Sequence, residues 1–435
     1  MKYIVVLGDG MADRPVSEIG NKTPLEEAVT KTIDRLSEKA EIGLSATIPE
    51  GMKPGSDTAN LSVLGYDPKI YYTGRSPLEA LSIGAPMKDT DIALRTNIVT
   101  IKEGCEAGSF GEFEIIDHSS SEIDTESSGE LLKACVDAFE ADEAFKKEYG
   151  IKDGEFKFYV GTSYRHCLIW DKGEVVELSQ PHDHLTEKIG QYMPVEFNEN
   201  NSLSDVQKDG LSKLQAMMKK SYEVLNHHPI NEERRKKGLN PANCMWFWGA
   251  GTKPMLSDFK ELNGKKGAMI SAVDLLKGIA VGANLHNIIV EGANGQLETN
   301  YEGKADAALK ALLEDGFDFV YIHVEAPDEM GHQGSLERKI KAIEYLDARL
   351  IARVVDGLEK SGEDFRILIM PDHATPLCVR THTSEPIPYL LYDSRKDMSE
   401  GASPCGAKLY SEKNAAALEK PAIPGPLMIK RLFEE

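Results

Sequence analysis

Aspartate and histidine residues follow three separate apolar runs of this sequence. Asp9 comes directly after YIVVLG, and Asp328 and His332 follow FVYIHVEA. Asp372 and His373 follow ILIMP in the same way. Apolar runs of this kind are typical of buried parallel strands, and open α/β sheets place ligand sites beyond the carboxyl ends of such strands. A lone aspartate at a strand end is most often a turn or capping residue, but three occurrences predict a shared site.

The side chains in this set are carboxylates and imidazoles, which are ligands for divalent ions such as Mn²⁺, Mg²⁺ and Zn²⁺. His382, in the segment RTHTSEPIP ahead of another apolar run, adds a third histidine. Three carboxylates gathered without a cation would repel one another, so the set favours one or two bound ions. Two adjacent ions are a recurring device for phosphoryl displacement, because one holds the attacking oxygen and the other the phosphoryl or leaving oxygen.

A serine in the segment KPGSDTANLSVLGYDP could supply the attacking oxygen. Ser56 follows a glycine turn and stands at the predicted start of a helix. Backbone N–H groups and the helix dipole favour an anion at such a position. A serine alkoxide there, bound to metal, would be a workable nucleophile. The same position also suits a helix N-cap, so Ser56 could instead have a purely structural role.

The elements that would position these residues form an α/β pattern at both ends of the chain. Thr23, Pro24 and Glu26 have the residue types preferred at the N-cap, N1 and N3 positions of a helix. In the C-terminal part, apolar runs alternate with helical stretches over 304–315 and 336–360. The predicted strands are 3–8, 41–48, 267–272, 287–292, 317–326, 365–370 and 387–393. This alternation predicts a mostly parallel sheet flanked by helices.

Residues 101–245 differ in character from both ends. They contain an acidic, serine-rich stretch, DHSSSEIDTESSGE, a predicted hairpin over 156–178 and a predicted amphipathic helix over 203–225. We interpret this region as part of a smaller α+β domain inserted into the first. The predicted domains are 1–75 with 261–435, and 76–260.

Composition sets limits on the partners of this protein. The 435 residues include 50 Lys and Arg against 71 Asp and Glu, and the net charge of −21 opposes nonspecific binding to nucleic acid or anionic lipid. The N-terminal apolar run is too short for a signal peptide, and no run reaches the length of a membrane span. Free thiols in a reducing compartment are expected, because no C-x-x-C pair occurs among Cys105, Cys135, Cys167, Cys244, Cys378 and Cys405. We therefore expect a cytoplasmic protein with a small partner.

The candidate ligands and Ser56 lie within a set of six segments, which follow one another along the chain: LGDGMADRP, PGSDTANLSVLGYDP, YYTGRSPLEA, APDEMGHQG, PDHATP and THTSEPIPYLLY. Together they resemble the cofactor-independent phosphoglycerate mutases of archaeal type, a family of the alkaline phosphatase superfamily. The resemblance implies an alkaline-phosphatase-like fold and two divalent ions, with Mn²⁺ preferred over Zn²⁺ or Mg²⁺. It also implies an isomerase of glycolysis that interconverts 3-phosphoglycerate and 2-phosphoglycerate through a phosphoserine at Ser56.

Matched motif by motif, the resemblance also assigns ligands to each ion. One ion would be held by Asp9, Ser56, Asp372 and His373. The second ion would be held by Asp328, His332 and His382. By contrast, His323 lies inside an apolar run and is expected to be a packed core residue.

The inserted domain is expected to bind the organic part of the substrate. In the related mutases, basic and histidine side chains of this domain grip carboxylate and phosphate groups. Lone arginines are more often solvated than bound to a ligand, so these assignments rest on the resemblance. The candidates are Arg75, Arg95, Arg165, His182, Arg234 and Lys253, and Glu79 falls in the same motif as Arg75.

Functions besides that of a mutase stay open at this point. The start of the chain and the segment QPHDHLTEKI resemble a bacterial branch for which a homoserine kinase role has been proposed, and Asp183 could bind the ammonium group of homoserine. The absence of a P-loop decides nothing, because a metal-bound serine would not need one. The same residues could also serve a phosphomonoesterase, or a degenerate relative that binds metal or sugar phosphate for regulation. Under the leading hypothesis the partner is a small phosphorylated substrate, and the oligomeric state is left open.

Overall fold

The computed structural model describes residues 1–102, 109–194, 203–399 and 408–434. These residues form two compact units, which are described separately. Unit 1 comprises Met1–Tyr72 and Met255–Glu435, and unit 2 comprises Thr73–Pro254. The predicted insertion, 76–260, begins and ends within a few residues of unit 2.

Unit 1 is built on an eight-stranded, mostly parallel sheet. The central strand β1 pairs in parallel with β10 and β11, whereas β12 runs antiparallel to both of its neighbours. This sheet confirms the predicted α/β class. Across the sheet, the strands are β13 (Ile423–Pro424), β2 (Glu41–Ala46), β12 (Ile387–Asp393), β11 (Phe365–Met370), β1 (Lys2–Gly8), β10 (Phe319–Val324), β8 (Gly267–Ile270) and β9 (His286–Ile288).

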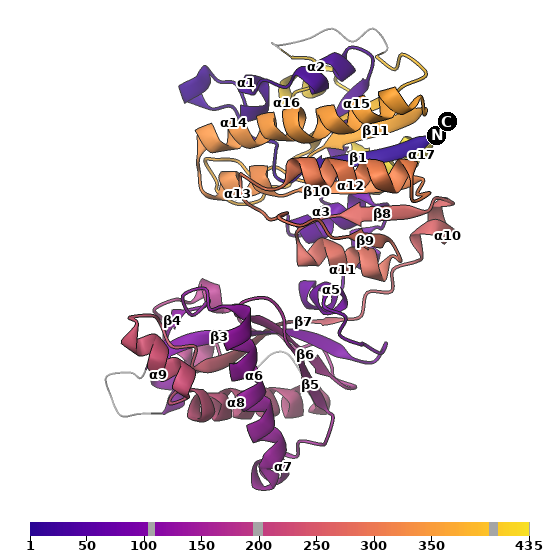
Figure 1. Ribbon diagram of the computed structural model, residues 1–435. Coiled ribbons are helices and arrows are strands. Elements are labelled where there is room, and N and C mark those ends of the chain that lie inside the picture. Colours follow the sequence, from indigo (N-terminus) through magenta and orange to yellow (C-terminus); the bar gives the residue numbers. More distant parts are fainter. Residues whose placement is uncertain (103–108, 195–202, 400–407, 435) are drawn as a thin grey trace. The chain divides into compact units, whose positions relative to one another are not determined.

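Helices cover both faces of this sheet (Figure 1). The α-helices of unit 1 are α1 (Pro24–Glu27), α2 (Lys31–Ser37), α3 (Ser56–Val63), α4 (Pro68–Tyr71), α10 (Phe259–Asn263), α11 (Asp274–Gly282), α12 (Tyr301–Leu313), α13 (Ala326–His332), α14 (Leu336–Tyr345), α15 (Ala352–Ser361), α16 (Glu412–Ala417) and α17 (Met428–Phe433). A π-helical stretch, Leu346–Ile351, joins α14 to α15, so the predicted helix over 336–360 is continuous but changes its winding. Short 3₁₀ helices occupy Ser17–Ile19 and Gly425–Leu427.

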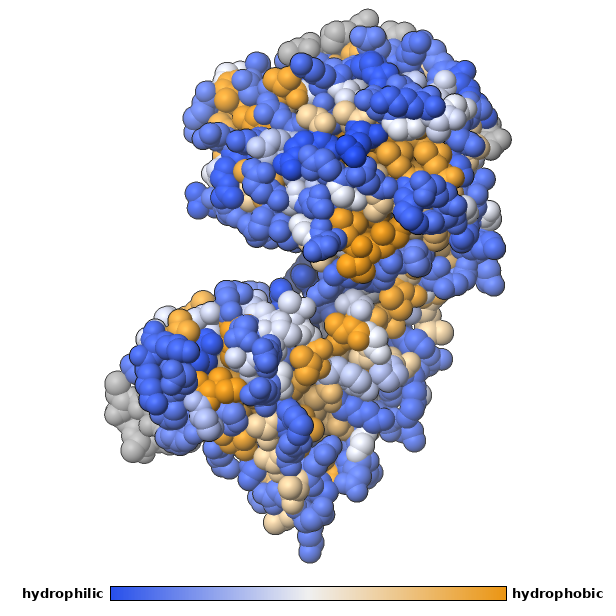
Figure 2. All heavy atoms as spheres, in the orientation of Figure 1, coloured by the Kyte–Doolittle hydropathy of each residue, from blue (hydrophilic) through white to orange (hydrophobic). Residues whose placement is uncertain are grey.

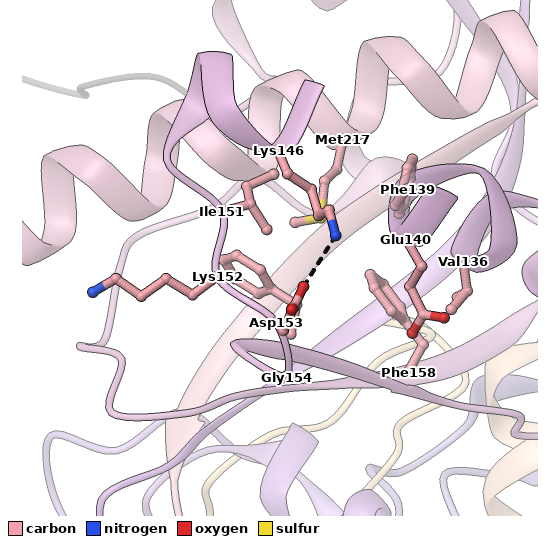
Figure 3. A pocket seen from close by; sticks show the side chains of 11 residues that line it. Val136, Phe139, Glu140, Lys146, Ile151, Lys152, Asp153, Gly154, Phe158 and Met217 are labelled. Carbon is pink, nitrogen blue, oxygen red and sulfur yellow. Dashed lines mark hydrogen bonds and ion pairs between the residues drawn. The ribbon is translucent and has the colours of Figure 1, made fainter. Parts of the chain in front are cut away.

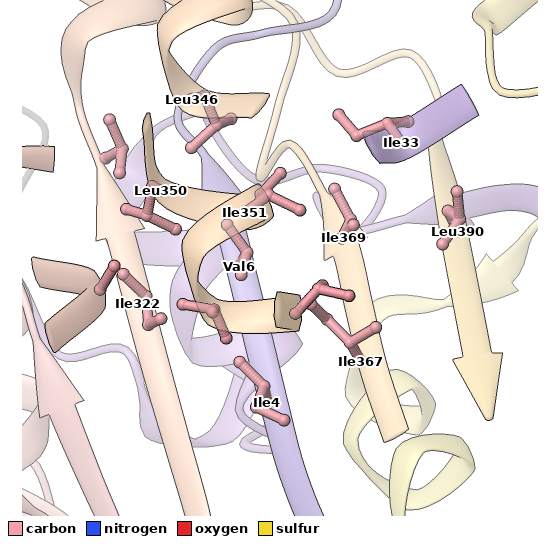
Figure 4. Close-up of a cluster of buried hydrophobic side chains, with 14 of the residues drawn as sticks. Ile4, Val6, Ile33, Ile322, Leu346, Leu350, Ile351, Ile367, Ile369 and Leu390 are labelled. Carbon is pink, nitrogen blue, oxygen red and sulfur yellow. The ribbon is translucent and has the colours of Figure 1, made fainter. Parts of the chain in front are cut away.

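Alternate side chains of the central strands point to opposite faces of the sheet. Ile4 and Val6 of β1 belong to a buried cluster with Leu346 and Leu350 (Figure 4). Tyr3 points to the other face, where its ring meets Phe433 of α17 edge-on at 5.0 Å. Because helices bury both faces, the strands read in the sequence as continuous apolar runs instead of alternating ones.

The strand order brings the predicted ligand residues together. β11, β1 and β10 are adjacent and parallel, so their carboxyl ends lie side by side at one edge of the sheet. Asp9, Asp328 and Asp372 follow those three strands. The fold therefore converts three distant sequence positions into one site, as open α/β sheets do.

Unit 2 is an α+β unit with an antiparallel sheet in the order β4–β3–β6–β5, and β7 also pairs with β3. Its strands are β3 (Ile92–Lys102), β4 (Glu114–Asp117), β5 (Phe156–Tyr159), β6 (Arg165–Trp170) and β7 (Cys244–Thr252). Its α-helices are α5 (Arg75–Ser82), α6 (Thr125–Ala141), α7 (Glu143–Tyr149), α8 (Asp205–Leu225) and α9 (Pro229–Lys236). Short 3₁₀ helices occupy Phe110–Glu112, Pro181–Asp183 and Ile189–Gln191.

The two faces of the unit 2 sheet pack against different helices. Leu94 and Leu168 belong to a core that includes side chains of α6 and α8. Ala93 and Cys167 point the other way and pack with Ala80 of α5. A cavity of about 270 Å³ lies on the α6 and α8 face (Figure 3), and it is lined by Val136, Phe139, Glu140, Lys146, Ile151, Lys152, Asp153, Gly154, Phe156, Phe158 and Met217.

Four predicted strands, 41–48, 267–272, 287–292 and 317–326, and the predicted hairpin are longer than the strands that the structure forms. The predicted strand 287–292 ends at Ile288, because β9 pairs with β8 over only three residues. The predicted hairpin over 156–178 ends at Trp170, where β6 gives way to a turn with Lys172 in the left-handed region at φ 55°. At Ile288 the apolar run continues beyond the last paired residue, whereas at Trp170 the polar segment 171–174 follows the last paired residue.

Hydrophilic residues predominate on the molecular face shown in Figure 2. Among the described residues, every helix is too short or too polar to cross a lipid bilayer. The cysteine prediction is confirmed for Cys135, Cys167, Cys244 and Cys378, which are free thiols. Cys105 and Cys405 lie outside the described residues.

Candidate metal centre

Seven predicted residues lie together at the carboxyl edge of the central strands of unit 1. The carboxylates of this group and one imidazole are buried, whereas the serine and the remaining two imidazoles are partly exposed. The centre therefore has a buried acidic floor and a partly open side. Its residues are Asp9, Ser56, Asp328, His332, Asp372, His373 and His382.

Ser56 is the first residue of α3, and its hydroxyl points at the centre. The N-cap of α3 is Gly55, so the hypothesis that Ser56 is only an N-cap is wrong. Ser56 Oγ lies 3.2 Å from Nε2 of His373 and 3.4 Å from Oδ2 of Asp9. Its hydroxyl is therefore held beside candidate ligands at a helix N-terminus, where a negative charge is favoured.

Asp328, His332 and His382 form one candidate ligand group. Helix α13 presents Asp328 and His332 one turn apart, and Nε2 of His332 lies 3.1 Å from Oδ2 of Asp328. Nε2 of His382 lies 3.5 Å from Oδ1 of Asp328 and 3.1 Å from Nε2 of His332. The hydrogen bond to Asp328 raises the pKa of His332 to about 9. Burial opposes ionisation of Asp328, but the two histidines lower its pKa well below the usual value.

Asp9, Asp372 and His373 form the buried part of the centre. Nε2 of His373 lies 3.5 Å from Oδ1 of Asp9 and 3.5 Å from Oδ2 of Asp372. Burial and the charges of Asp372 and Asp328 raise the pKa of Asp9 well above its usual value. Oδ1 of Asp9 is buried without a hydrogen-bond partner among the described residues. A cation would compensate both the repulsion and the unpaired oxygen, so the residues fit a metal site.

His323 was expected to be a packed core residue, and the structure buries it but also places it beside Asp9. Its side chain is fully buried, and Nε2 lies 3.0 Å from Oδ2 of Asp9. Burial lowers the pKa of His323 to about 3, so the imidazole is neutral. The side chains of Tyr321 and His323 share the face of β10 that packs toward α3, and the continuous apolar run concealed this alternation.

Asn60 and Tyr321 form a second part of the centre that the sequence analysis missed. The side-chain amide of Asn60 donates hydrogen bonds to the Ser56 carbonyl at 2.8 Å and to Oδ2 of Asp372 at 2.9 Å. The Tyr321 hydroxyl donates to Oδ1 of Asn60 at 2.6 Å. Asn60 follows Ser56 by one helical turn, and this spacing is the signal from which its position could have been found.

A buried lysine ties together the loops that follow β1 and β11. Nζ of Lys339 lies 2.8 Å from Oδ2 of Asp13, 2.8 Å from the Thr375 carbonyl and 3.3 Å from the Ala12 carbonyl. Asp13 also accepts a hydrogen bond from the Leu377 backbone. This ion pair is fully buried and hydrogen-bonded at both partners, which is the condition for a buried pair to be tolerated.

We expect Glu412 to contribute to the pH dependence of stability. Its carboxylate accepts hydrogen bonds from the Asp13 backbone at 3.1 Å and the Thr23 hydroxyl at 2.7 Å. Burial raises its pKa from the ordinary value of 4.5 to about 7. Because the folded-state pKa is the higher one, this stabilisation is present below pH 4.5 and is lost as the pH rises through 7. Between pH 4.5 and 7 the free energy of unfolding should fall by about 2 kcal/mol less in Glu412→Gln than in the wild type, as measured by urea unfolding.

The matched control for this experiment is Glu38→Gln, which changes an exposed carboxylate in the same unit. Its unfolding free energy should follow the wild-type pH curve. An unchanged pH curve for Glu412→Gln would contradict the assignment.

Arg75 and Arg95 of unit 2 share one carboxylate. Nε of Arg75 lies 2.9 Å from Oε1 of Glu79, and Nε of Arg95 lies 2.8 Å from Oε2. Burial, opposed by Glu79 and aided by the charges of Arg75 and Arg165, lowers the pKa of Arg95 to about 10. Three cationic side chains therefore lie close enough to influence one another, and Glu79 supplies the nearest negative charge.

Trp248 connects this arginine group to His182. The Arg95 guanidinium lies over the Trp248 ring at 4.3 Å, and the His182 ring meets the same ring at 5.5 Å between centroids. The Arg165 guanidinium lies over the Tyr164 ring at 5.2 Å. These residues define the arginine cluster of unit 2: Arg75, Glu79, Arg95, Arg165, His182 and Trp248.

Two predicted substrate residues have different partners. Nε of Arg234 donates to the Asn240 carbonyl at 3.0 Å, and its Nη2 donates to the Ser120 carbonyl. Lys253 pairs with Asp89 at 3.1 Å. Arg234 thus binds backbone carbonyls, and these contacts provide no support for placing Arg234 or Lys253 in the arginine cluster.

The sequence and the fold were compared with those of known proteins. Residues 37–231 match the profile of a family described as 2,3-bisphosphoglycerate-independent phosphoglycerate mutase. A protein of that name from Methanosarcina barkeri is 44% identical over 404 residues, which cover 92% of this chain and 93% of the relative. A solved structure from Pyrococcus horikoshii has a TM-score of 0.75 and 28% identity and covers 100% of this chain and 98% of that chain. A cofactor-independent phosphoglycerate mutase from Thermoplasma acidophilum has a TM-score of 0.62 and 25% identity, with 99% of both chains covered.

Proposed function

Since this chain belongs to the family of 2,3-bisphosphoglycerate-independent phosphoglycerate mutases, we propose that it interconverts 3-phosphoglycerate and 2-phosphoglycerate by metal-dependent phosphoryl transfer through Ser56. The observation that carries this proposal is the 44% identity to a mutase over more than nine-tenths of both chains. The geometry of the centre supports it, because one hydroxyl lies among carboxylate and imidazole ligands at a helix N-terminus.

The proposed nucleophile is Ser56. Its Oγ attacks the phosphorus of the substrate, the bond from phosphorus to the glycerate oxygen breaks, and the proton lost by the serine is balanced by the one that glycerate gains. The other glycerate hydroxyl then takes the phosphoryl group back from Ser56. His373, 3.2 Å from Oγ, and Asn60, which donates to the Ser56 carbonyl, hold the serine in place for both steps.

We assign the seven residues of the centre to two divalent ions. When bound, such ions would offset the charge of the carboxylates and stabilise the oxygens on either side of the transferred phosphorus. Carboxylates and imidazoles without a thiolate suit Mn²⁺, Zn²⁺ and Mg²⁺. Mn²⁺ is the proposed ion because the family resemblance favours it. The proposed ligand sets are Asp9, Ser56, Asp372 and His373 for one ion, and Asp328, His332 and His382 for the other.

The charged groups of the substrate are assigned to the arginine cluster of unit 2. Phosphoglycerate carries a carboxylate and a phosphate, and guanidinium groups bind both through charge-assisted hydrogen bonds. Arg165 is exposed, and among the described residues its guanidinium has no carboxylate ion pair. Arg165 is therefore the cluster residue most available to a ligand.

We expect Arg165→Gln to weaken substrate binding without loss of stability. The substitution removes an exposed charge, so KM for 3-phosphoglycerate should rise about 10- to 100-fold with the melting temperature unchanged. The matched variant is Arg234→Gln, which should lower the melting temperature because the Ser120 and Asn240 carbonyls lose their donors. Steady-state kinetics and thermal unfolding of both variants separate the two roles. An unchanged KM for Arg165→Gln would remove Arg165 from the proposed site.

A single set of assays separates the proposed activity from those of a kinase, a phosphomonoesterase and a regulator. Purified protein with Mn²⁺ should form 2-phosphoglycerate from 3-phosphoglycerate, as detected by coupling to enolase. The same protein should give no phosphohomoserine from ATP and homoserine, and little inorganic phosphate from either phosphoglycerate. Phosphohomoserine formation without mutase turnover would establish the kinase, and steady phosphate release would establish the phosphomonoesterase. Metal binding without any of these activities would favour a regulatory protein that is not an enzyme.

A further inference from the structure

We infer that His323 is a positioning residue of the metal centre, which holds one oxygen of Asp9 and thereby commits the other oxygen to a bound cation. His323 belongs to neither ligand set proposed above. The inference rests on the proposed metal centre, but it does not depend on which substrate the enzyme uses.

The hydrogen bonds around His323 favour donation from its Nε2 to Asp9. Oγ of Ser271 accepts the backbone N–H of Val273 at 3.1 Å and lies 3.3 Å from Nδ1 of His323. If the serine hydroxyl donates to Nδ1, the ring proton resides on Nε2, which lies 3.0 Å from Oδ2 of Asp9. A neutral imidazole with its proton on Nε2 then donates to the carboxylate.

The opposite tautomer is disfavoured by the groups that it would leave unpaired. In the metal-bound centre, where Asp9 would be an ionised ligand, a lone pair on Nε2 would face Oδ2 of Asp9 at 3.0 Å, and two acceptors at that distance repel each other. If His323 instead shared a cation with Oδ2 of Asp9, then Oδ1 would stay buried without a partner. Donation from His323 to Oδ2, with a cation at Oδ1, satisfies both oxygens.

The position of the His323 ring is also held from the backbone. Lys304 of α12 is fully buried, and its Nζ donates to the His323 carbonyl at 2.8 Å. On the neighbouring strand β1, Leu7 is in register with His323. Asp9 follows Leu7 by two residues, so the strand pairing fixes the position of His323 along the strands relative to Asp9. The imidazole is therefore supported by a parallel strand pair, a lysine and a serine, as expected for a residue that orients a ligand.

The test is a titration of metal-free protein with Mn²⁺, in which electron paramagnetic resonance measures free Mn²⁺. His323→Leu should weaken one Mn²⁺ site by about 10- to 100-fold and leave the other within about threefold. His323→Gln should restore the weakened site, because its side-chain amide places an N–H donor near the position of Nε2. Ile322→Val is the matched control, since it alters a buried neighbour on the other face of β10 and should change neither site.

Three outcomes would overturn the assignment. Equal weakening of both sites by His323→Leu and Ile322→Val would indicate a general loss of packing. Failure of His323→Gln to restore the site would exclude the N–H donor as the cause. Loss of a Mn²⁺-bound nitrogen coupling in His323→Gln would make His323 a direct ligand. A protein that lacks mutase turnover but shows the predicted Mn²⁺ pattern would refute the proposed function and leave this inference standing.

Discussion

Replacing Ser56 by alanine should abolish mutase turnover, with a fall in kcat of at least about 10³-fold. The proposed reaction needs an oxygen that accepts the phosphoryl group, and Oγ of Ser56 is the hydroxyl that lies beside both His373 and Asp9. The fold should persist, because Gly55 occupies the N-cap of α3 and the Ser56 hydroxyl contacts Asp9 and His373. Enolase-coupled kinetics and circular dichroism measure the two effects.

Ser62→Ala is the matched control for this variant. Ser62 lies on the same helix, and its hydroxyl is buried without a hydrogen-bond partner among the described residues. Removing that hydroxyl should leave turnover within a few-fold of the wild type. Substantial turnover by Ser56→Ala would refute the phosphoserine mechanism. Peptide mass spectra that place the phosphoryl group of the wild-type enzyme on another residue would refute it as well.

The sequence predicted the chemistry of the centre better than its supporting residues. Asp9, Asp328 and Asp372 were identifiable because each follows an apolar run typical of a buried strand, and the pattern occurs three times. Their convergence required the order β11, β1, β10, which the runs themselves do not specify. The resemblance to a known family predicted the convergence in another way, because the matching motifs assign these residues to neighbouring ions.

His323 shows why the supporting residues were missed. In a strand buried on both faces, every position reads as apolar, so a histidine in the run looks like packing. The alternation of side chains decides which face of the sheet His323 takes. His323 and Tyr321 lie on the same face of β10, and this face packs against α3, where Asn60 accepts a hydrogen bond from the Tyr321 hydroxyl. If the odd-numbered residues of β10 had been assigned to the face that packs against α3, Tyr321 and His323 would both have been placed in the centre.

The arginine cluster illustrates a different limit. Six residues were predicted to bind substrate from residue type and resemblance, and Arg234 had the same standing as Arg165. Arg234 donates to two backbone carbonyls, whereas the Arg165 guanidinium lies exposed over Tyr164. Hydrogen bonds to carbonyls in distant loops leave no periodic signal, so the sequence could not separate an arginine that binds backbone from one that can bind a ligand.

Removing the divalent ions should abolish mutase activity, and adding Mn²⁺ should restore it. The electrostatics of the site give the reason: burial and the charges of Asp372 and Asp328 raise the pKa of Asp9. In addition, Oδ1 of Asp9 has no hydrogen-bond partner among the described residues. Dialysis against a chelator, followed by metal analysis and a coupled assay at increasing Mn²⁺, measures this dependence. We expect turnover to fall by more than about 10³-fold and to recover with two ions bound per chain.

Variants of single ligand residues should fall into two groups, each of which loses affinity for a different ion. His332→Ala and His382→Ala should each lower affinity for the same ion by more than about 100-fold, since their Nε2 atoms lie 3.1 Å apart and both lie close to Asp328. Asp372→Ala should lower affinity for the other ion, because Asp372 lies beside His373.

His286→Ala, an exposed histidine of unit 1, is the control and should retain both ions. If His332→Ala and His382→Ala removed different ions, or if Asp372→Ala removed the same ion as they do, the proposed ligand sets would be wrong. The phosphoserine at Ser56 would then still be tested separately, because its detection by peptide mass spectrometry needs neither ligand assignment.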